Sequence, residues 1–344
     1  MKHVLLAIVL LAATAALAAA DDRVQLTFDA SECDAVLSIL EKRASGAAVS
    51  DEDWQRLFSS EPYVRLKKRE SSMRRDFSDE DFRKFVLSDG LAQRAPALRR
   101  TLDAWKKADL SAVVHRILPY LPSSAQVKVS VYPVIKPRTN SFVFEPGTNP
   151  AIFLYLDPEQ GLSEFENTVA HESHHIGFAH ISKQYEERIK FLPQNAQKAA
   201  KWMGAFGEGL AVLAAAGSAG GHPLQDFSAD QRMRWDQDME FVDDNVIELN
   251  QFFLDVIGGG YAKPEVIDHV AFTFFGYRGP WYTVGYRMGQ IVEKRFGRAV
   301  LIECMSDPRQ LLKRYNEAAA EQNATGKGRL ALWSPELLKA VGAE

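Results

Sequence analysis

The stretch AHESHHIGFAH, residues 170–180, holds four of the chain's eight histidines: His171, His174, His175 and His180. His171 and His175 are four positions apart, so on a helix their side chains lie on one face. With Glu172 between them they form the pattern H-E-x-x-H, in which two imidazoles can bind one zinc ion. The glutamate then lies beside the metal, where it can take a proton from water. The stretch therefore predicts a helix that carries two zinc ligands and a general base.

His174 and His180 are not expected to bind the metal. In the metzincin pattern HExxHxxGxxH, a third histidine counted from His175 would fall on Ile181. A frame that ends on His180 would need a histidine at position 170, where the chain has Ala170. On a helix, His180 lies about 140° around the axis from His175. We expect both residues to pack inside the protein or to contact the metal ligands.

The residues before and within the motif predict how its helix is placed. Ser163 to Glu166 has the form of a capping box, which predicts that the helix begins at Ser163. Phe165, Val169 and Ile176 fall on the face opposite the histidine pair. That face can pack on a sheet while the histidines point into a cleft.

The chain before the motif changes from a helical to a strand pattern. Residues 21–122 are predicted to be a helical N-terminal region, in which Ser50 and Ser78 each precede acidic residues, as helix N-caps do. Short strands are predicted at residues 127–134, 140–144 and 151–156. We therefore expect an α+β, mostly α, fold with a small sheet just before the motif helix. The metal-binding domain would span residues 123–344.

Glu208 is the best candidate for the third ligand that zinc catalysis requires. It is the only charge between Met203 and Ala216, and a buried lone carboxylate is costly unless it is paired or binds a metal. Gly207 and Gly209 flank it and would let another helix approach closely. A salt bridge to an arginine or a helix cap remains the alternative role. Rival ligands in or beside a loop are His222, Asp226 and Asp230.

These motifs carry a family resemblance. HExxH followed by E-G-x-A, here Glu208 to Ala211, resembles the gluzincin metallopeptidases, although the gap of 33 positions after His175 is longer than in aminopeptidase N-like or thermolysin-like members. Five segments extend the match: VYPVIKPRTNSFVFE (131–145), AIFLYLDP (151–158), FENTVAHESHHIGFA (165–179), GEGLAVLAAAGS (207–218) and GPWYTVGYRMGQIVEKRFG (279–297). They resemble an uncharacterised bacterial family of zinc-dependent peptidases over most of the chain.

The resemblance implies a zincin-like catalytic domain with one zinc ion per chain, held by His171, His175 and Glu208, and a peptide or protein substrate. Glu172 would act as the general base. Gluzincins often use a tyrosine or histidine to stabilise the oxyanion, which points first to Tyr282, then to Tyr286 and more weakly to His269. The alternatives are that both tyrosines only pack their helix and that His269 is a core residue. The expected activity is hydrolysis of peptide bonds.

Two other functions remain open at this point. The motif describes only the metal and the water, so the substrate could be a cell-wall peptide or another amide. A non-catalytic exported protein could also use a zincin fold to bind a partner. The formal net charge of −4 argues against nucleic-acid binding. The oligomeric state is not predicted.

The first 20 residues have the pattern of a secretory signal peptide: Lys2, an apolar run from Val4 to Leu17, and then small residues. An uncleaved anchor is the alternative. We expect a periplasmic or secreted protein, with no membrane span after the signal is removed. Cys33 and Cys304 could form a disulfide in such a compartment, but their spacing does not show whether they do.

Overall fold

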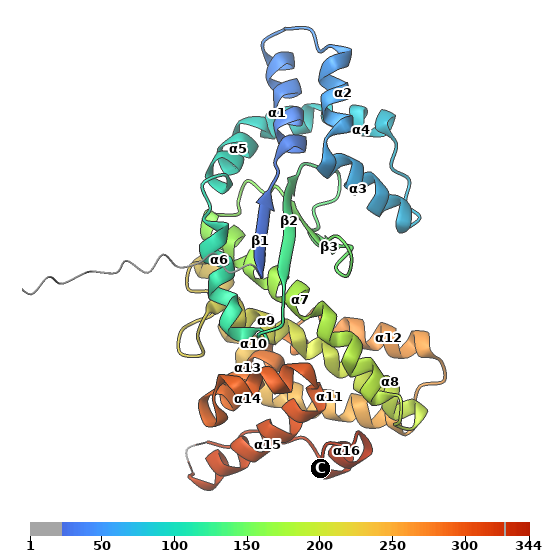
Figure 1. Cartoon of the computed structure of the whole chain (residues 1–344), viewed down its shortest axis with the longest axis vertical. Helices are drawn as coiled ribbons and strands as arrows, with labels where there is room; N and C mark the ends of the chain where they lie inside the picture. The colour runs from blue at the N-terminus through green and yellow to red at the C-terminus, as the bar shows by residue number, and fades with distance from the viewer. Residues whose placement is uncertain (1–22, 327) are drawn as a thin grey trace, which may run out of the picture.

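The computed structural model describes residues 23–326 and 328–344, apart from the side chains of His180, Ser182 and Lys183. The predicted signal peptide lies outside these residues, as does the predicted role of the His180 side chain. Figure 1 shows the N-terminal helices at one end, the later helices at the other, and the sheet and helix α7 between them. The fold is α+β and mostly helical, as predicted.

From residue 23 to 122, the described part of the region expected to be helical, the chain forms six helices, preceded by one short strand that was not expected, β1 (Val24–Phe28). The helices are α1 (Ser31–Ala44), α2 (Asp51–Ser59), α3 (Glu61–Ser72), α4 (Asp79–Val86), α5 (Asp89–Trp105) and α6 (Leu110–Ile117), followed by the 3-10 turn η1 (Leu118–Tyr120). The predicted N-caps are confirmed, since Ser50 accepts from the Asp53 amide and Ser78 from the Asp81 amide.

Among the described residues, four strands form one mixed sheet in the order β1-β2-β4-β3. The other strands are β2 (Val127–Val134), β3 (Phe142–Phe144) and β4 (Ala151–Tyr155), close to the predicted bounds. β1 pairs in parallel with β2 and β2 with β4, whereas β3 is antiparallel to β4 at one edge. The strand that was not predicted, β1, is five residues long and alternates apolar and polar residues as VQLTF, with the apolar ones partly buried.

The two faces of the sheet are covered by different helices. Val127, Val129 and Val131 of β2 join the main core, which also contains the apolar face of α7. Tyr132 and Val134 point the other way and pack in a smaller cluster with Leu66 of α3. This alternation is the period-2 pattern of a strand, and β2 is buried on both faces in its second half, whereas Lys128 in its first half is exposed.

In the part of the chain that the structure describes, ten helices follow the sheet. They are α7 (Leu162–Ile189), α8 (Gln194–Met203), α9 (Gly207–Ala216), α10 (Ala229–Glu240), α11 (Val242–Ile257), α12 (Pro264–Thr273), α13 (Pro280–Phe296), α14 (Arg298–Ser306), α15 (Pro308–Ala324) and α16 (Pro335–Ala340), with the 3-10 turn η2 (Gly204–Phe206) between α8 and α9. Among the described residues, no helix is long and apolar enough to cross a bilayer.

The start of α7 corrects one expectation. The helix begins at Leu162, its N-cap is Gly161, and no side chain caps it, so the capping box at Ser163 is wrong. Packing places this helix instead: the Phe165 ring stacks on Trp105 at 4.4 Å and meets Phe28 edge-on at 6.1 Å. Cys33 and Cys304, whose pairing was open, are both free and buried.

Candidate metal centre

Helix α7 presents the histidine pair of the motif on one face, as its spacing predicts. The Nε2 atoms of His171 and His175 lie 3.1 Å apart, and the two rings meet edge to face. On the opposite face, Phe165, Val169 and Ile176 are buried in the main core. The apolar half of the helix therefore holds the two imidazoles in place, and their nitrogens converge on one point.

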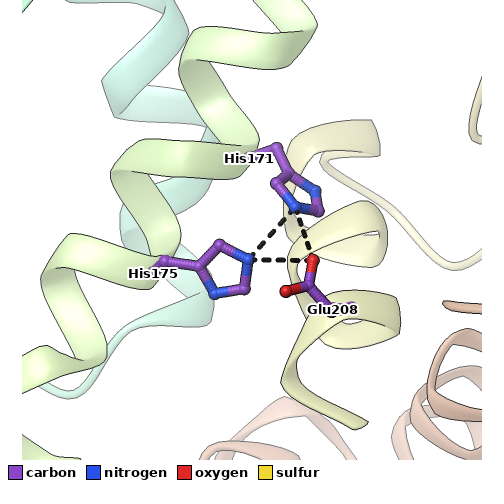
Figure 2. Close-up of side chains that lie close together, drawn as sticks. All are labelled: His171, His175 and Glu208. Atoms are coloured by element: carbon purple, nitrogen blue, oxygen red, sulfur yellow. Dashed lines mark hydrogen bonds and ion pairs between the residues drawn. The ribbon is translucent and has the colours of Figure 1, made fainter. Parts of the chain in front are cut away.

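Glu208, in the first turn of α9, approaches the same point from a second helix. Its Oε2 lies 3.1 Å from Nε2 of His171 and 3.3 Å from Nε2 of His175. Figure 2 shows the three side chains pointing toward one another from α7 and α9. Among the described residues, these three form the group of acidic, histidine and cysteine side chains that could hold a metal ion. The structure thus brings together the three predicted ligands.

A close helix crossing places Glu208. A Cβ atom at Gly209 would lie 2.2 Å from the Tyr282 carbonyl oxygen of α13, and one at Gly285 would lie 2.4 Å from the Phe206 carbonyl oxygen. The two backbones therefore touch where only glycine fits. Gly207 plays no part in this contact, because a Cβ there would meet nothing within 4 Å. The expected close approach depends on one of the two flanking glycines.

The donor set and its spacing fit zinc. Tetrahedral zinc with ligands at about 2.0–2.1 Å has ligand atoms about 3.3 Å apart. The three donor atoms here are separated by 3.1, 3.1 and 3.3 Å. Two imidazole nitrogens and one carboxylate oxygen are a common catalytic zinc set, which leaves the fourth position for water or substrate.

The charges at this point also favour a cation. Burial raises the pKa of Glu208, but its hydrogen bonds with His171 and His175 outweigh burial and hold the pKa well below its usual value. Burial lowers the pKa of His175, but the hydrogen bond with Glu208 and the charges of Glu208 and Glu172 raise it overall. The carboxylate therefore stays ionised and ready to bind a positive charge.

The sequence of residues 54–324 matches a protein family described as "Putative zinc dependent peptidase (DUF5700)". The chain belongs to this family. The matched region contains both histidines and Glu208, and it agrees with the resemblance seen in the sequence. Neither a curated protein nor a solved structure matches the chain.

The rival ligands lie elsewhere in the structure. Nε2 of His222 pairs with Asp236 at 3.1 Å, and its Nδ1 accepts from the Leu224 amide, while Asp226 and Asp230 are exposed. None belongs to the described cluster of possible metal ligands.

His174 is buried, with 3% of its surface exposed, as expected for a packing residue. Burial and the neighbouring His175 and His171 hold its pKa well below the usual value, so the ring is neutral. It places a polar but uncharged ring beside the candidate ligands His171 and His175.

Tyr282 and Tyr286, one turn apart on α13, have different surroundings. The Tyr282 ring lies 6.4 Å from the His171 ring, nearly parallel to it. Its pKa is raised by burial and then by the charges of Glu208 and Glu172, so its hydroxyl remains protonated. The Tyr286 hydroxyl donates to the Gly221 carbonyl at 3.4 Å and accepts from Gln290 at 3.0 Å. Of the two, only Tyr282 contacts a residue of the metal centre.

Two further predicted residues can be placed. Glu172 is half-buried, and in the described part of the chain no hydrogen bond or ion pair engages its carboxylate, although its charge acts on His175 and Tyr282. It is therefore available to accept a proton beside the three ligands.

His269 is exposed on α12, so the idea of a core histidine there is wrong.

Proposed function

We propose that this chain is a zinc-dependent metallopeptidase of gluzincin type that hydrolyses peptide bonds. The convergence of His171, His175 and Glu208 carries the proposal, because three such donors at zinc spacing leave an open position for chemistry. Membership of a family described as a zinc dependent peptidase supports it. The gluzincin subtype and export rest on the sequence alone.

The side chains at the centre divide the reaction between them. Zinc held by His171, His175 and Glu208 would supply a Lewis acid that acidifies water and polarises the scissile carbonyl. Glu172 then takes a proton from the attacking water and delivers it to the nitrogen of the leaving amine. The Tyr282 hydroxyl donates a hydrogen bond to the carbonyl oxygen as negative charge develops there.

The unengaged carboxylate of Glu172 favours an enzyme over a binding protein, because a binding protein needs no general base beside its ligands. Hydrolysis of a cell-wall peptide or another amide would use the same residues, so these activities must be distinguished by testing substrates of each kind.

Export rests on the signal-peptide pattern of residues 1–20. It predicts that the protein recovered outside the cytoplasm begins near residue 21, which N-terminal mass spectrometry can check.

The test combines metal content with activity. Elemental analysis should find one zinc per chain in the wild type, in Glu172→Gln and in the exposed-histidine control His269→Ala, but little in Glu208→Ala. On a mixed peptide library, Glu172→Gln should lower the rate roughly 100-fold or more while keeping its zinc.

The contradicting results are distinct. Zinc retained by Glu208→Ala would place the third ligand elsewhere. Full activity of zinc-loaded Glu172→Gln would remove the proposed general base. No tightly bound metal in the wild type at neutral pH would favour the binding protein. An intact peptide library together with cleavage of cell-wall peptides would favour the narrower hydrolase.

A further inference from the structure

A pocket of about 190 Å³ opens beside the metal centre. We call it the α7–α14 pocket, and its main walls are Phe178, Ile181 and Tyr185 of α7, Leu210 of α9 and Met305 of α14. His175 and Gly207 also line it, and Gly207 directly precedes Glu208. His175 therefore belongs both to the pocket wall and to the group of three candidate ligands.

The pocket is chemically apolar. The Tyr185 hydroxyl donates to the Ala200 carbonyl at 2.8 Å, and the Ser306 hydroxyl donates to the Ile302 carbonyl at 3.3 Å. These polar atoms are thus already satisfied. Among the described residues that line the pocket, none is acidic or basic apart from the two imidazoles of His174 and His175. A charged group entering it would lose water and, among the described lining residues, would meet no carboxylate, ammonium or guanidinium group of opposite charge.

The volume suits a large side chain. An apolar cavity of about 150 Å³ is enough to bind benzene. The α7–α14 pocket exceeds that size, and His175, one of the three candidate ligands, forms part of its wall. It can hold the side chain of leucine, methionine or phenylalanine while the attached backbone stays beside His175.

We propose that the α7–α14 pocket binds an uncharged, apolar side chain of one of the two substrate residues that flank the scissile bond. This proposal rests on the peptidase function proposed above and names its substrate class. Apolar contact in a closed pocket discriminates by roughly 10- to 100-fold for small differences in side-chain size. Substrates with aspartate or lysine at that position are rejected more strongly, because their charge would be buried unpaired.

Gly204 offers a way to fill the pocket without straining the backbone. It is exposed at the rim, has helical torsion angles (φ −57°, ψ −24°), and a Cβ there would meet nothing within 4 Å. Gly204→Leu therefore adds a branched side chain at the pocket. Gly90→Leu is the matched control, because Gly90 is exposed and open in α5, at the other end of the chain's fold.

The experiment uses zinc-loaded full-length protein and blocked hexapeptides that differ only at one of the two central residues: Leu, Phe, Gly, Asp or Lys. Cleavage by the wild type gives kcat/KM for each peptide. Binding to Glu172→Gln gives Kd without cleavage. We expect Leu or Phe to exceed Gly by at least about 10-fold in one of the two positions, with Asp and Lys weakest. Gly204→Leu should reduce the ratio of kcat/KM for the Leu peptide to kcat/KM for the Gly peptide at least 10-fold, whereas Gly90→Leu should leave this ratio unchanged.

Each result decides the proposal. Cleavage with no preference at either position, or a ratio unchanged by Gly204→Leu, overturns the pocket assignment and leaves the peptidase function standing. The preferred Kd pattern without any cleavage supports the pocket and overturns the peptidase function. Absence of both binding and cleavage overturns both. Met305→Ala, which enlarges the pocket, gives a second check: it should shift the preference from Leu toward Phe, and an unshifted preference counts against the pocket.

Discussion

Two glutamates in different parts of the fold, one partly and one fully buried, behave in opposite ways. Glu208 faces His171 and His175, and its pKa lies well below the usual value. Glu32, in the first turn of α1, is fully buried, and its Oε2 accepts a hydrogen bond from the Ile135 amide at 3.0 Å. Burial raises the pKa of Glu32 to about 8, and the Ile135 amide, Cys33 and the charge of Lys136 offset it only in part.

The difference shows that burial alone does not make a carboxylate a metal ligand. Burial raises the pKa of both groups, so the partners decide the outcome. Two imidazoles keep Glu208 ionised, as a cation site needs. The Ile135 amide, Cys33 and Lys136 together leave Glu32 protonated at neutral pH, where it links α1 to the end of β2 as a neutral group.

The largest expected effect comes from the crossing that places Glu208. Gly209→Ala should lower the free energy of unfolding by at least about 3 kcal/mol, because its Cβ would overlap the backbone of α13. Gly207→Ala should leave it unchanged or raise it by up to about 1 kcal/mol, since the added methyl meets open space. Urea unfolding of both variants measures this contrast. Equal stability of the two would mean that α9 and α13 do not touch here.

Glu32→Gln tests the other glutamate through pH. The folded protein keeps a proton on Glu32 between about pH 4.5 and 8, whereas the unfolded chain releases it. The free energy of unfolding of the wild type should therefore fall with rising pH across that window. Glutamine keeps the acceptor for the Ile135 amide and removes this dependence, so at pH 7 the variant should be more stable by about 2–3 kcal/mol.

Denaturant unfolding of the wild type and Glu32→Gln at pH 5, 7 and 8 would measure this gain in the free energy of unfolding. It should be small at pH 5 and grow toward pH 8. A benefit that does not change with pH would show that Glu32 is ionised in the folded protein, like Glu208.

The smallest effect separates the two tyrosines of α13. Tyr282→Phe should lower kcat on a cleaved peptide roughly 10- to 100-fold with little change in KM, because its hydroxyl acts only as charge develops. Tyr286→Phe should change kcat less than about 3-fold and cost about 1 kcal/mol of stability, since it loses hydrogen bonds to Gly221 and Gln290. The reverse pattern in steady-state kinetics would make Tyr286 the oxyanion donor.

The parts of the site that depend on local spacing were predictable from the sequence. His171 and His175 share a helix face because they are four residues apart, and β2 has the predicted bounds because its residues alternate. Glu208 was detectable because it is the lone charge in an apolar segment. Glu32 was not, because Asp34 and Glu41 nearby make its helix look like an exposed one.

The remainder depends on contacts between distant segments. Tyr282 and Tyr286 share one helix, and only the packing of α13 against α9 and the ring pair of Tyr282 with His171 show which of them is near the histidines. Met305 lies in α14, about 130 residues after His175, and has no local signal of a pocket. The α7 N-terminus was placed by tertiary packing and not by the capping box that its sequence suggests.

The pairing of β1 with β2 has a consequence for the order of folding. Val24 pairs with Val127, so all of α1 to α6 forms the connection between two neighbouring parallel strands. A chain made at roughly 5–20 residues per second must continue for roughly 5–20 seconds after β1 before β2 exists. Non-local pairings of this kind form slowly because a long loop must close first. β1, one of the first segments to be synthesised, therefore cannot pair with β2 until all the helices between the two strands have been synthesised.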